Sequence, residues 1–403
     1  MIDAVGEHGY SGTRVRDLCA RAGVSTTTLY AEFGDKDGYF LATFEAVAGR
    51  AGERVREAYL AEQDWTCQLY AGVRAFTREV AEQPAAARLA LVEILGGGPT
   101  ALVRLERESN VFANMIQASF EQAPDGITLP PLLARGVVGG ISRVSRQLLV
   151  EHREKELPSL ADTLSEWALT YRCESAWRLP DAPQAKPGKE QPPPLSWSAQ
   201  TDQRTFILHI TARITALRRY PNLTIDSIVR AAGPLGDAFF VLYPGTARDR
   251  TERCFLDAYD LMGSEVIEVA ADAATQASDW IDSIRLGIVA LLRHIADDPV
   301  FARCAFIEVF SVGTAGIEHR SRLMDRLAAL LLSIVPADKR PPETIAEAIV
   351  GAVWQIAHHY VARRATSQLP ELVDHATYLV LAPIIGGEAA MQRILDPKKH
   401  PPK

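Results

Sequence analysis

Apolar residues recur at helical spacing along most of this 403-residue chain. Over residues 133–153 and 345–364 they return every three or four positions, as in a helix with a buried face. No strand-like alternation of apolar and polar residues of any length interrupts these segments. Prolines such as Pro84 and Pro299 fall at the ends of the helical patterns. The pattern therefore predicts an all-α protein with helices of ordinary length.

A proline-rich segment divides the chain almost in half. Residues 179–198 hold six prolines among Lys, Gln and Gly residues, namely Pro180, Pro183, Pro187, Pro192, Pro193 and Pro194. Such a composition cannot bury a core of its own and favours an extended polar linker. We expect this linker over 179–200 and a short tail over 396–403.

The two halves resemble each other in sequence. Residues 64–95 align with residues 279–310 at a constant separation of 215 positions. Residues 137–160 align with residues 349–372 at a separation of 212 positions. A nearly constant separation through successive blocks indicates a duplicated domain rather than a solenoid of short repeats. We expect roughly nine helices in each copy.

The N-terminal region predicts a short helix followed by a tight turn. Thr13 is a good N-cap residue for a helix over 14–22. The expected inward-facing residues of this helix are Val15, Leu18 and Ala22. Gly23 follows, where the absence of a side chain permits a sharp reversal of the chain.

A second short helix is predicted directly after this glycine. Ser25 can cap a helix over 26–33, with Leu29 and Phe33 on its inner face, and Asp35 can cap the next helix. Helix, glycine turn and helix form the arrangement that places a recognition helix in the major groove of DNA. The outer face carries hydroxyls and small residues, which suit close approach to phosphates and base edges: Thr26, Thr27, Tyr30 and Ala31.

These residues carry a resemblance to a known family. The run "GYSGTRVRDLCARAGVSTTTLYAEFGDKDGYF" resembles the DNA-binding domain of TetR-family transcriptional regulators in its Gly-Tyr, Ala-Gly-Val-Ser and Leu-Tyr elements and its following lysine. The resemblance implies contacts to double-stranded DNA through Thr13, Arg14, Ser25, Thr26, Thr27, Thr28, Tyr30 and Lys36. It also implies that the rest of each copy is a helical domain that binds a small-molecule effector and forms a dimer interface.

With the resemblance, the chain divides into six expected regions. They are a helix-turn-helix domain (1–44), a helical effector and dimerisation domain (45–178), the linker (179–200), a degenerate helix-turn-helix domain (201–262), a second helical effector and dimerisation domain (263–395) and the tail (396–403).

The second copy keeps the scaffold of the helix-turn-helix but not its reading face. In "PLGDAFFVLY" Pro234, Gly236 and Asp237 replace a valine and two threonines, whereas Phe239 and Tyr243 keep the apolar inner face. Glycine and aspartate weaken a short helix, and the carboxylate repels phosphate. We therefore expect that this second helix-turn-helix domain, or second head, does not read bases. Non-specific DNA contact by its arginines is the alternative.

Charge and composition further limit the expected DNA binding and the class of protein. The net charge is −7, and residues 1–50 hold five basic against seven acidic side chains, so DNA binding has to be local. Residues 204–262 hold eight arginines against six acidic residues. The apolar fraction of 47% and the five scattered cysteines, without a pairing pattern, are typical of a reduced protein of the cytoplasm. No run of residues reaches the length of a membrane span.

Effector contacts are only weakly indicated. Polar or aromatic residues on mostly apolar helices form the candidate pocket set, which is Trp65, Glu93, Phe112, Trp280, Glu308, Trp354 and His358. For each of them a role in the core or an interface is commoner than ligand contact. Glu93 and Glu308 occupy matching places in the two copies, which favours a shared architectural role for this pair.

The function expected from these patterns is sequence-specific regulation of transcription. The expected mode is a repressor that a ligand releases from DNA. The two copies are expected to pair within one chain through their last two helices, as a pseudo-dimer held by the linker. Pairing between chains is the alternative arrangement, and a homodimer of such chains is a further partner state. The alternative function is a helical dimerisation scaffold or small-ligand sensor that does not bind DNA. Catalytic and metal-binding motifs are missing from the sequence, so we expect no enzymatic activity, cofactor or metal.

Overall fold

The computed structural model describes residues 1–123, 129–172, 179–188 and 202–395. These residues form α-helices, short 3₁₀-helices and turns, with no β-strand among them. The expected all-α fold is therefore confirmed. The predicted tail (396–403), residues 189–200 of the predicted linker and Cys173 lie outside the described residues.

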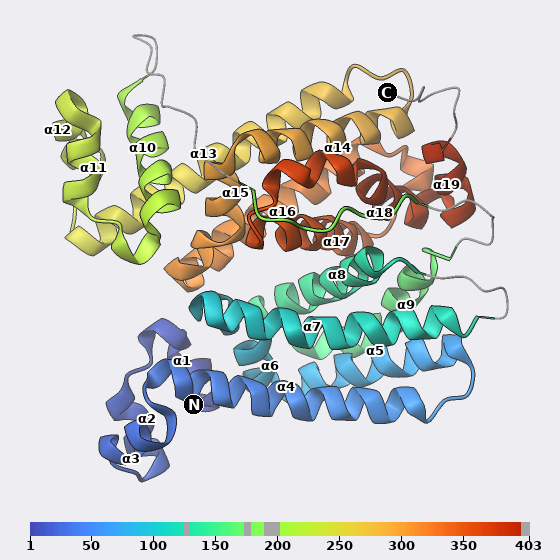
Figure 1. The fold of residues 1–403 in the computed structure, drawn as a ribbon, viewed down its shortest axis with the longest axis horizontal. Coiled ribbons are helices and arrows are strands. Elements are labelled where there is room, and N and C mark those ends of the chain that lie inside the picture. The colour runs from blue at the N-terminus through green and yellow to red at the C-terminus, as the bar shows by residue number, and fades with distance from the viewer. Residues whose placement is uncertain (124–128, 173–178, 189–201, 396–403) are drawn as a thin grey trace. The chain divides into compact units, whose positions relative to one another are not determined.

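The helices of the first half follow each other with short connections (Figure 1). They are α1 (Ile2–Gly12), α2 (Val15–Ala22), α3 (Thr26–Phe33), α4 (Lys36–Leu60), α5 (Trp65–Glu82), α6 (Pro84–Leu91), η1 (Glu93–Gly96), α7 (Gly98–Glu121), α8 (Pro131–Val150), η2 (Glu154–Leu160) and α9 (Ala161–Leu169).

The second half has a matching order of elements. They are α10 (Gln203–Arg218), η3 (Tyr220–Asn222), α11 (Ile225–Ala232), η4 (Gly233–Leu235), α12 (Gly236–Leu242), α13 (Ala247–Ala274), α14 (Trp280–Asp297), α15 (Pro299–Phe306), η5 (Glu308–Val312), α16 (Thr314–Ile334), η6 (Ala337–Lys339), α17 (Glu343–Ala362), η7 (Thr366–Leu372), α18 (Val373–Ile385) and α19 (Gly387–Leu395).

Aspartates begin equivalent helices in the two halves. The Asp64 carboxylate accepts hydrogen bonds from the backbone N–H groups of Thr66 and Cys67 at the start of α5. The Asp279 carboxylate does the same for two backbone N–H groups at the start of α14. Each carboxylate thus satisfies N–H groups that have no partner inside the helix. Both helices run for 18 residues and end next to a proline that opens the following helix.

The chain forms two compact units that differ from the two halves of the sequence. Unit 1 consists of the described residues of Met1–Asp181, Lys339–Ile356 and Tyr378–Lys403. Unit 2 consists of those of Ala182–Asp338 and Ala357–Thr377. Helices α17 and α18 therefore contribute residues to both units, and unit 1 contains helical segments from both halves of the sequence.

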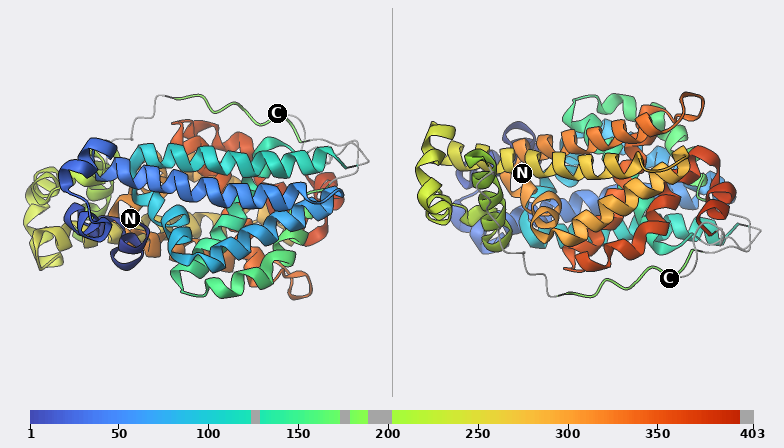
Figure 2. Two further views of the ribbon diagram at one scale, coloured as in Figure 1. Left: turned by 90° about the horizontal axis from the view of Figure 1, so that it is seen from below. Right: turned by 90° about the horizontal axis from the view of Figure 1, so that it is seen from above.

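Unit 1 is built on long helices that pack side by side. Figures 1 and 2 show α4, α5, α7 and α8, drawn in blue to teal, as neighbours. Phe40, Phe44 and Phe120 are fully buried among them. Burial of each such aromatic side chain is worth about 1.5–3 kcal/mol, so these residues contribute substantially to the core of unit 1.

Unit 2 is organised around α13, a helix of 28 residues. It packs along α14 and α16, and near its start it contacts α10 and α11. Phe255, Tyr259 and Met262 are buried on its inner side. A single long helix therefore supports both the small head of unit 2, formed by α10, α11 and α12, and the helices that follow.

The described part of the predicted linker, residues 179–188, contains no helix. Within unit 2 it is held by main-chain hydrogen bonds. The N–H of Gly188 donates to the carbonyl oxygen of Arg364 (2.7 Å), and the N–H of Lys186 donates to Oε1 of Gln368 (2.9 Å). The end of the segment thus contacts the region of η7, and its role as a linker stays a prediction.

Two further findings concern the described residues as a whole. Their helices include none that combines the length and the apolar character needed to cross a membrane. Four cysteines are free thiols, namely Cys19, Cys67, Cys254 and Cys304.

Candidate nucleic-acid interface

The first helix of the predicted motif, α2, begins one residue later than expected. Its N-cap is Arg14, which makes no capping hydrogen bond with its side chain, so the prediction of Thr13 as N-cap was wrong. Thr13 is 3% exposed, and its hydroxyl donates to the carbonyl oxygens of Ala4 (3.1 Å) and Gly9 (2.7 Å). The Thr13 side chain thus ties α2 to α1 and does not lie on the outer surface.

The inner face of α2 is carried by Leu18 and Cys19, which are buried. Ala22 is exposed, contrary to the prediction, because the helix ends there and turns away. Gly23 adopts φ 65° and ψ 28°, a left-handed conformation that few residues other than glycine adopt. The predicted glycine turn between the two helices is confirmed.

The second helix, α3, has the predicted bounds and the predicted cap. The backbone N–H of Thr28 donates to Oγ of Ser25 (3.0 Å), and Leu29 is buried. Phe33 is 39% exposed and packs on Tyr39 of α4, with ring centroids 4.6 Å apart. Its predicted inward position was wrong, since the last residue of α3 lies beside the following helix rather than over the core.

The outer face of α3 is a surface of hydroxyl groups. Ser25, Thr26, Thr27 and Thr28 are all exposed, and Tyr30 is 49% exposed. Arg14, just before α2, is exposed as well. Six of the eight residues predicted to contact DNA are therefore accessible, and five of these six lie on or next to one short helix.

Arg16 is a further basic residue of this surface, which the sequence pattern does not single out, and its side chain on α2 is 83% exposed. Nε of Arg16 lies 3.9 Å from Oδ1 of the neighbouring Asp17. An exposed guanidinium in this helix is suited to a backbone phosphate.

Lys36, the first residue of α4, is half-buried against the N-terminal head, which consists of α1, α2 and α3. Its ammonium donates to the carbonyl oxygens of Tyr10 (3.0 Å) and Thr13 (3.2 Å) and lies 4.2 Å from the centroid of the Tyr10 ring. Partial burial lowers the pKa of this amine. Lys36 therefore holds the end of α1 against the start of α4, and its contact to phosphate stays a prediction.

Tyr10 is the residue on which these contacts converge. Its ring packs on Phe40 (centroids 4.2 Å apart), and its hydroxyl donates to Asp37. Its backbone N–H donates to Oε2 of Glu93 (2.8 Å). Burial, and then the hydrogen bond to Asp37, raise the pKa of the phenol. The sequence indicates this tyrosine only as part of the Gly-Tyr element, because its partners are distant in the chain.

Glu93 reaches the head from the helical domain. It lies in η1, is 5% exposed, and its Oε1 is 3.5 Å from Nε of Arg88. Glu308, the matching residue of the second half, is 2% exposed, and its Oε2 accepts a hydrogen bond from the backbone N–H of Tyr220 (2.9 Å). The two glutamates thus have equivalent structural contacts, as their matching sequence positions indicated.

The head of unit 2 keeps the inner face of the motif. Thr224 and Ser227 form a reciprocal capping box at the start of α11. Phe239 is fully buried and Tyr243 is 3% exposed, as predicted. A Cβ on Gly236 would lie 2.8 Å from the carbonyl oxygen of Val229, so glycine is required there by the close approach of α11 and α12.

The outer face of α12 differs in chemistry from that of α3. Phe240 (42%), Val241 (82%) and Leu242 (37%) are exposed, and Arg250 lies over the Phe240 ring at 5.3 Å from its centroid. Apolar side chains offer no hydrogen bonds to phosphates or base edges. The surface that carries hydroxyl groups in the first head carries these apolar side chains and Asp237 in the second.

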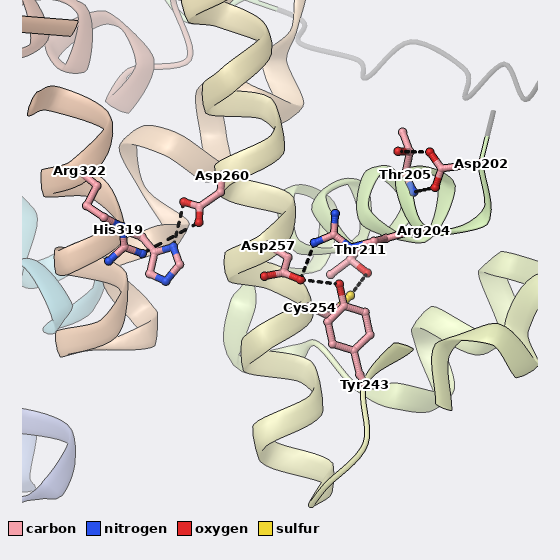
Figure 3. A network of polar contacts seen from close by, with 10 residues as sticks. All are labelled: Asp202, Arg204, Thr205, Thr211, Tyr243, Cys254, Asp257, Asp260, His319 and Arg322. Carbon is pink, nitrogen blue, oxygen red and sulfur yellow. Dashed lines mark hydrogen bonds and ion pairs between the residues drawn. The ribbon is translucent and has the colours of Figure 1, made fainter. Parts of the chain in front are cut away.

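A polar network fastens this second head to α13 (Figure 3). The Asp257 carboxylate accepts hydrogen bonds from Arg204 of α10 and from the hydroxyl of Tyr243, both at 2.9 Å. One turn further along, Asp260 lies 2.8 Å from Nδ1 of His319 on α16. Burial raises the pKa of Tyr243. These contacts engage Arg204 and Tyr243 within unit 2.

The aromatic effector candidates of the first half have packing partners in unit 1. Trp65 is 8% exposed and packs on Phe120, with ring centroids 5.6 Å apart. Phe112 meets Phe76 edge-on at 6.1 Å. Trp65 is therefore a core residue of the helical domain, whereas Phe112 is only partly buried. The contact of either residue with an effector stays a prediction.

The effector candidates of the second half are spread over several elements. Trp280 is the first residue of α14 in unit 2. Trp354 and His358 lie one turn apart on α17, yet Trp354 is assigned to unit 1 and His358 to unit 2. The described residues contain no group of three His, Cys, Asp or Glu side chains that could hold a metal ion.

Comparison with known proteins bears on the N-terminal head. Residues 3–52 match the family described as "Bacterial regulatory proteins, tetR family". This match confirms the resemblance inferred for the head and supports a DNA-binding transcriptional regulator. No curated protein is similar enough in sequence to count as a relative.

Two solved structures are similar to part of the chain. The transcriptional regulator FadR from Bacillus subtilis, in complex with stearoyl-CoA, has 17% sequence identity and a TM-score of 0.39 over 41% of this chain and 92% of FadR. The fatty acid degradation regulator FadR from Bacillus halodurans has 17% identity and a TM-score of 0.37 over 42% of this chain and 93% of that one.

Proposed function

We propose that this chain, whose residues 3–52 form an N-terminal domain of the tetR family, is a sequence-specific transcriptional regulator that reads DNA with α3. The observation that carries the proposal is the exposed hydroxyl surface on a capped, glycine-flanked helix. Hydroxyl side chains and a phenol on such a helix can contact base edges, while the first helix of the motif crosses the backbone. No reaction is assigned to the protein, since the family matched is one of regulators.

Individual roles follow from exposure. Thr26, Thr27 and Tyr30 are proposed to face the major groove, and Ser25 and Thr28, at the start of α3, to face phosphate. Arg14 is proposed to contact phosphate from the start of α2.

Each chain is proposed to present one reading head. The outer face of α12 is apolar, and the carboxylate of Asp257 holds Arg204 within unit 2. A regulator of this type gains affinity from two heads spaced by a helical turn of DNA or a multiple of it. Two chains are therefore proposed to bind one operator.

The two sequence copies are proposed to pair within the chain, as a pseudo-dimer. Four residues of unit 1 support this pairing through reciprocal contacts between α8 and α17. A Cβ on Gly139 would lie 2.2 Å from Cβ of Gln355, and a Cβ on Gly351 would lie 2.5 Å from Cβ of Arg143. Each contact is the image of the other at the separation of 212 residues that relates the copies.

A second reciprocal pair supports the same symmetry. A Cβ on Gly140 would lie 2.5 Å from the carbonyl oxygen of Ala348, and a Cβ on Gly136 would lie 3.6 Å from Cβ of Ala352. Gly136 and Ala348, like Gly140 and Ala352, are 212 residues apart. Reciprocal contact of equivalent residues is the signature of an interface with two-fold symmetry. It supports both the duplication and the pairing of the copies.

The proposed switch is release by a ligand. A small molecule that binds one state of the helical domain more tightly shifts the population of head orientations. Ligand binding then lowers the affinity for the operator, and by thermodynamic linkage operator binding lowers the affinity for the ligand by the same factor. We propose repression as the mode, with effector identity to be found by ligand screening against the DNA complex.

The test of DNA reading is a gel shift and footprint on the DNA that flanks the gene of this protein. The wild type should protect a site, whereas a Thr27→Ala, Tyr30→Ala variant should not. The matched control is Val241→Ala on α12, which should bind as the wild type does. Absence of a footprint with wild type would favour the alternative, a helical scaffold or small-ligand sensor.

The test of the pseudo-dimer uses a protease site inserted between residues 188 and 189. Light scattering over a range of dilutions should show a 44.1 kDa particle, the mass of one chain, both before and after cutting without denaturant. Separation of the two pieces would contradict pairing within the chain. A particle of twice this mass at every dilution, falling apart only on denaturation, would favour pairing between chains.

A further inference from the structure

The same contact between a head and its helical domain is built twice. In unit 1 the carboxylate of Glu93 accepts a hydrogen bond from the N–H of Tyr10, and in unit 2 that of Glu308 accepts one from the N–H of Tyr220. The distances are 2.8 and 2.9 Å, and the partners are 83 and 88 residues apart. The occurrence of this contact in both units points to a function of the contact.

The backbone at these tyrosines explains why an acceptor is needed. Gly9 adopts φ 66° and ψ 168°, which interrupts α1 just before Tyr10. Arg219 adopts φ 70° and ψ 150°, just before Tyr220, a conformation strained for a residue with a side chain. An interrupted helix leaves the next N–H without its acceptor one turn earlier. In each unit a glutamate from the helical domain supplies that acceptor.

Both carboxylates are also anchored on the side of the helical domain. Oε1 of Glu93 lies 3.5 Å from Nε of Arg88, the residue five positions earlier. Oε1 of Glu308 lies 2.9 Å from Nη2 of Arg303, also five positions earlier. Each glutamate thus connects an arginine of the helical domain to the interrupted helix of the head. A displacement of α6 and η1 relative to the head has to stretch or break this connection.

From these contacts, and resting on the proposed function, we propose that Glu93 is a positioning residue for DNA reading. It fixes the orientation of the α1–α3 head on the helical domain through the N–H of Tyr10. Since α3 must enter the groove at a defined angle, loss of this contact lets the head sample unproductive orientations. Glu308 makes the equivalent contact in the head that does not read bases, so its loss leaves operator affinity unchanged.

The test compares three variants of the full-length protein, Glu93→Ala, Glu93→Gln and Glu308→Ala. Operator affinity is measured by fluorescence anisotropy on the footprinted site. We expect Glu93→Ala to weaken binding about tenfold or more, the effect of losing a buried hydrogen bond to a charged group. Glu93→Gln keeps an oxygen that accepts from Tyr10 and should restore most of the affinity. Glu308→Ala removes the same interaction from unit 2 and should bind as the wild type does.

Two results would overturn the proposal. One is a Glu93→Ala variant with wild-type affinity. The other is equal weakening by Glu93→Ala and Glu308→Ala, which would show a general loss of stability instead of positioning. Failure of Glu93→Gln to restore affinity, at an unchanged thermal midpoint, would likewise count against a role through the Tyr10 N–H.

Amide hydrogen exchange separates this proposal from the proposed function. The peptide that contains the Tyr10 amide should exchange faster in Glu93→Ala than in wild type, without DNA. Unchanged exchange at Tyr10 refutes the positioning contact even if the wild type binds its operator. Conversely, if the wild type binds no DNA, both the proposed reading by α3 and the role of Glu93 in it are refuted. Faster exchange at Tyr10 in Glu93→Ala would in that case still establish the contact itself.

Discussion

Substitution of Gly140 by alanine tests the close packing of α8 on α17 within unit 1. A Cβ at this position would lie 2.3 Å from Cη2 of Trp167 and 2.5 Å from the carbonyl oxygen of Ala348. Neither atom is the tip of a flexible side chain, because one belongs to a buried indole and the other to a helix backbone. The helices must therefore shift apart to admit a single methyl group.

The expected magnitude follows from two opposing terms. Overpacking of a rigid site costs about 3 kcal/mol, the upper part of its usual range. Replacing glycine by alanine inside a helix returns about 1 kcal/mol. A net loss of about 2 kcal/mol lowers the thermal midpoint of a domain of roughly 150–250 residues by about 4–8 °C.

The matched control is Gly49→Ala in α4, where a Cβ would meet no atom within 4 Å. The same chemical change should there stabilise the protein by about 1 kcal/mol and raise the midpoint by about 2–4 °C. Differential scanning calorimetry of the intact chain measures both. Equal midpoints for the two variants, or a higher one for Gly140→Ala, would refute the close approach of α8 and α17.

Three further predictions concern the heads. Ser25→Ala should cost about 1 kcal/mol of local stability by removing the cap of α3, measured as faster amide exchange in that helix. Lys36→Met should lower the thermal midpoint as well as DNA affinity, because two carbonyl oxygens lose their donor; lowered affinity at an unchanged midpoint would instead favour a phosphate contact. The hydrogen bond to Glu265 raises the pKa of His209 above its ordinary 6.5, so its stabilisation is full below pH 6.5 and is lost as pH rises through the higher folded value. Glu265→Gln should therefore flatten the fall in midpoint between pH 6 and pH 8.5.

Most helices could be predicted because their signals are local. Ser25 and Asp35 are followed within three residues by the N–H groups that they cap, and apolar periodicity fixes which side of each helix is buried. The error at Thr13 has the same origin. A threonine before a helix predicts an N-cap, but the hydroxyl of Thr13 donates to carbonyl oxygens of α1 instead. These partners are apparent only in the folded head.

The supports of the candidate site could not be predicted because they join distant residues. Lys36 meets the carbonyl oxygen of Tyr10 across 26 positions, and Glu93 meets its N–H across 83. In the sequence alone, a lysine beside a recognition helix indicates a phosphate contact, and a glutamate on an apolar helix indicates a pocket residue. The interruption of α1 at Gly9, which leaves the Tyr10 N–H without an acceptor in the helix, explains the contact with Glu93 and is visible only in the folded head.

The contrast between the heads bears on how such a chain would hold an operator. The first fifty residues carry two more acidic than basic side chains, and the amine of Lys36 is engaged inside the head. Few phosphates can then be neutralised by one head, so non-specific electrostatic affinity has to be small. The second head exposes apolar side chains on α12. Under the proposed function, affinity is therefore expected to depend on the orientation of α3 and on a second chain. A rigid link between the head and the helical domain would then matter more than in a strongly basic head.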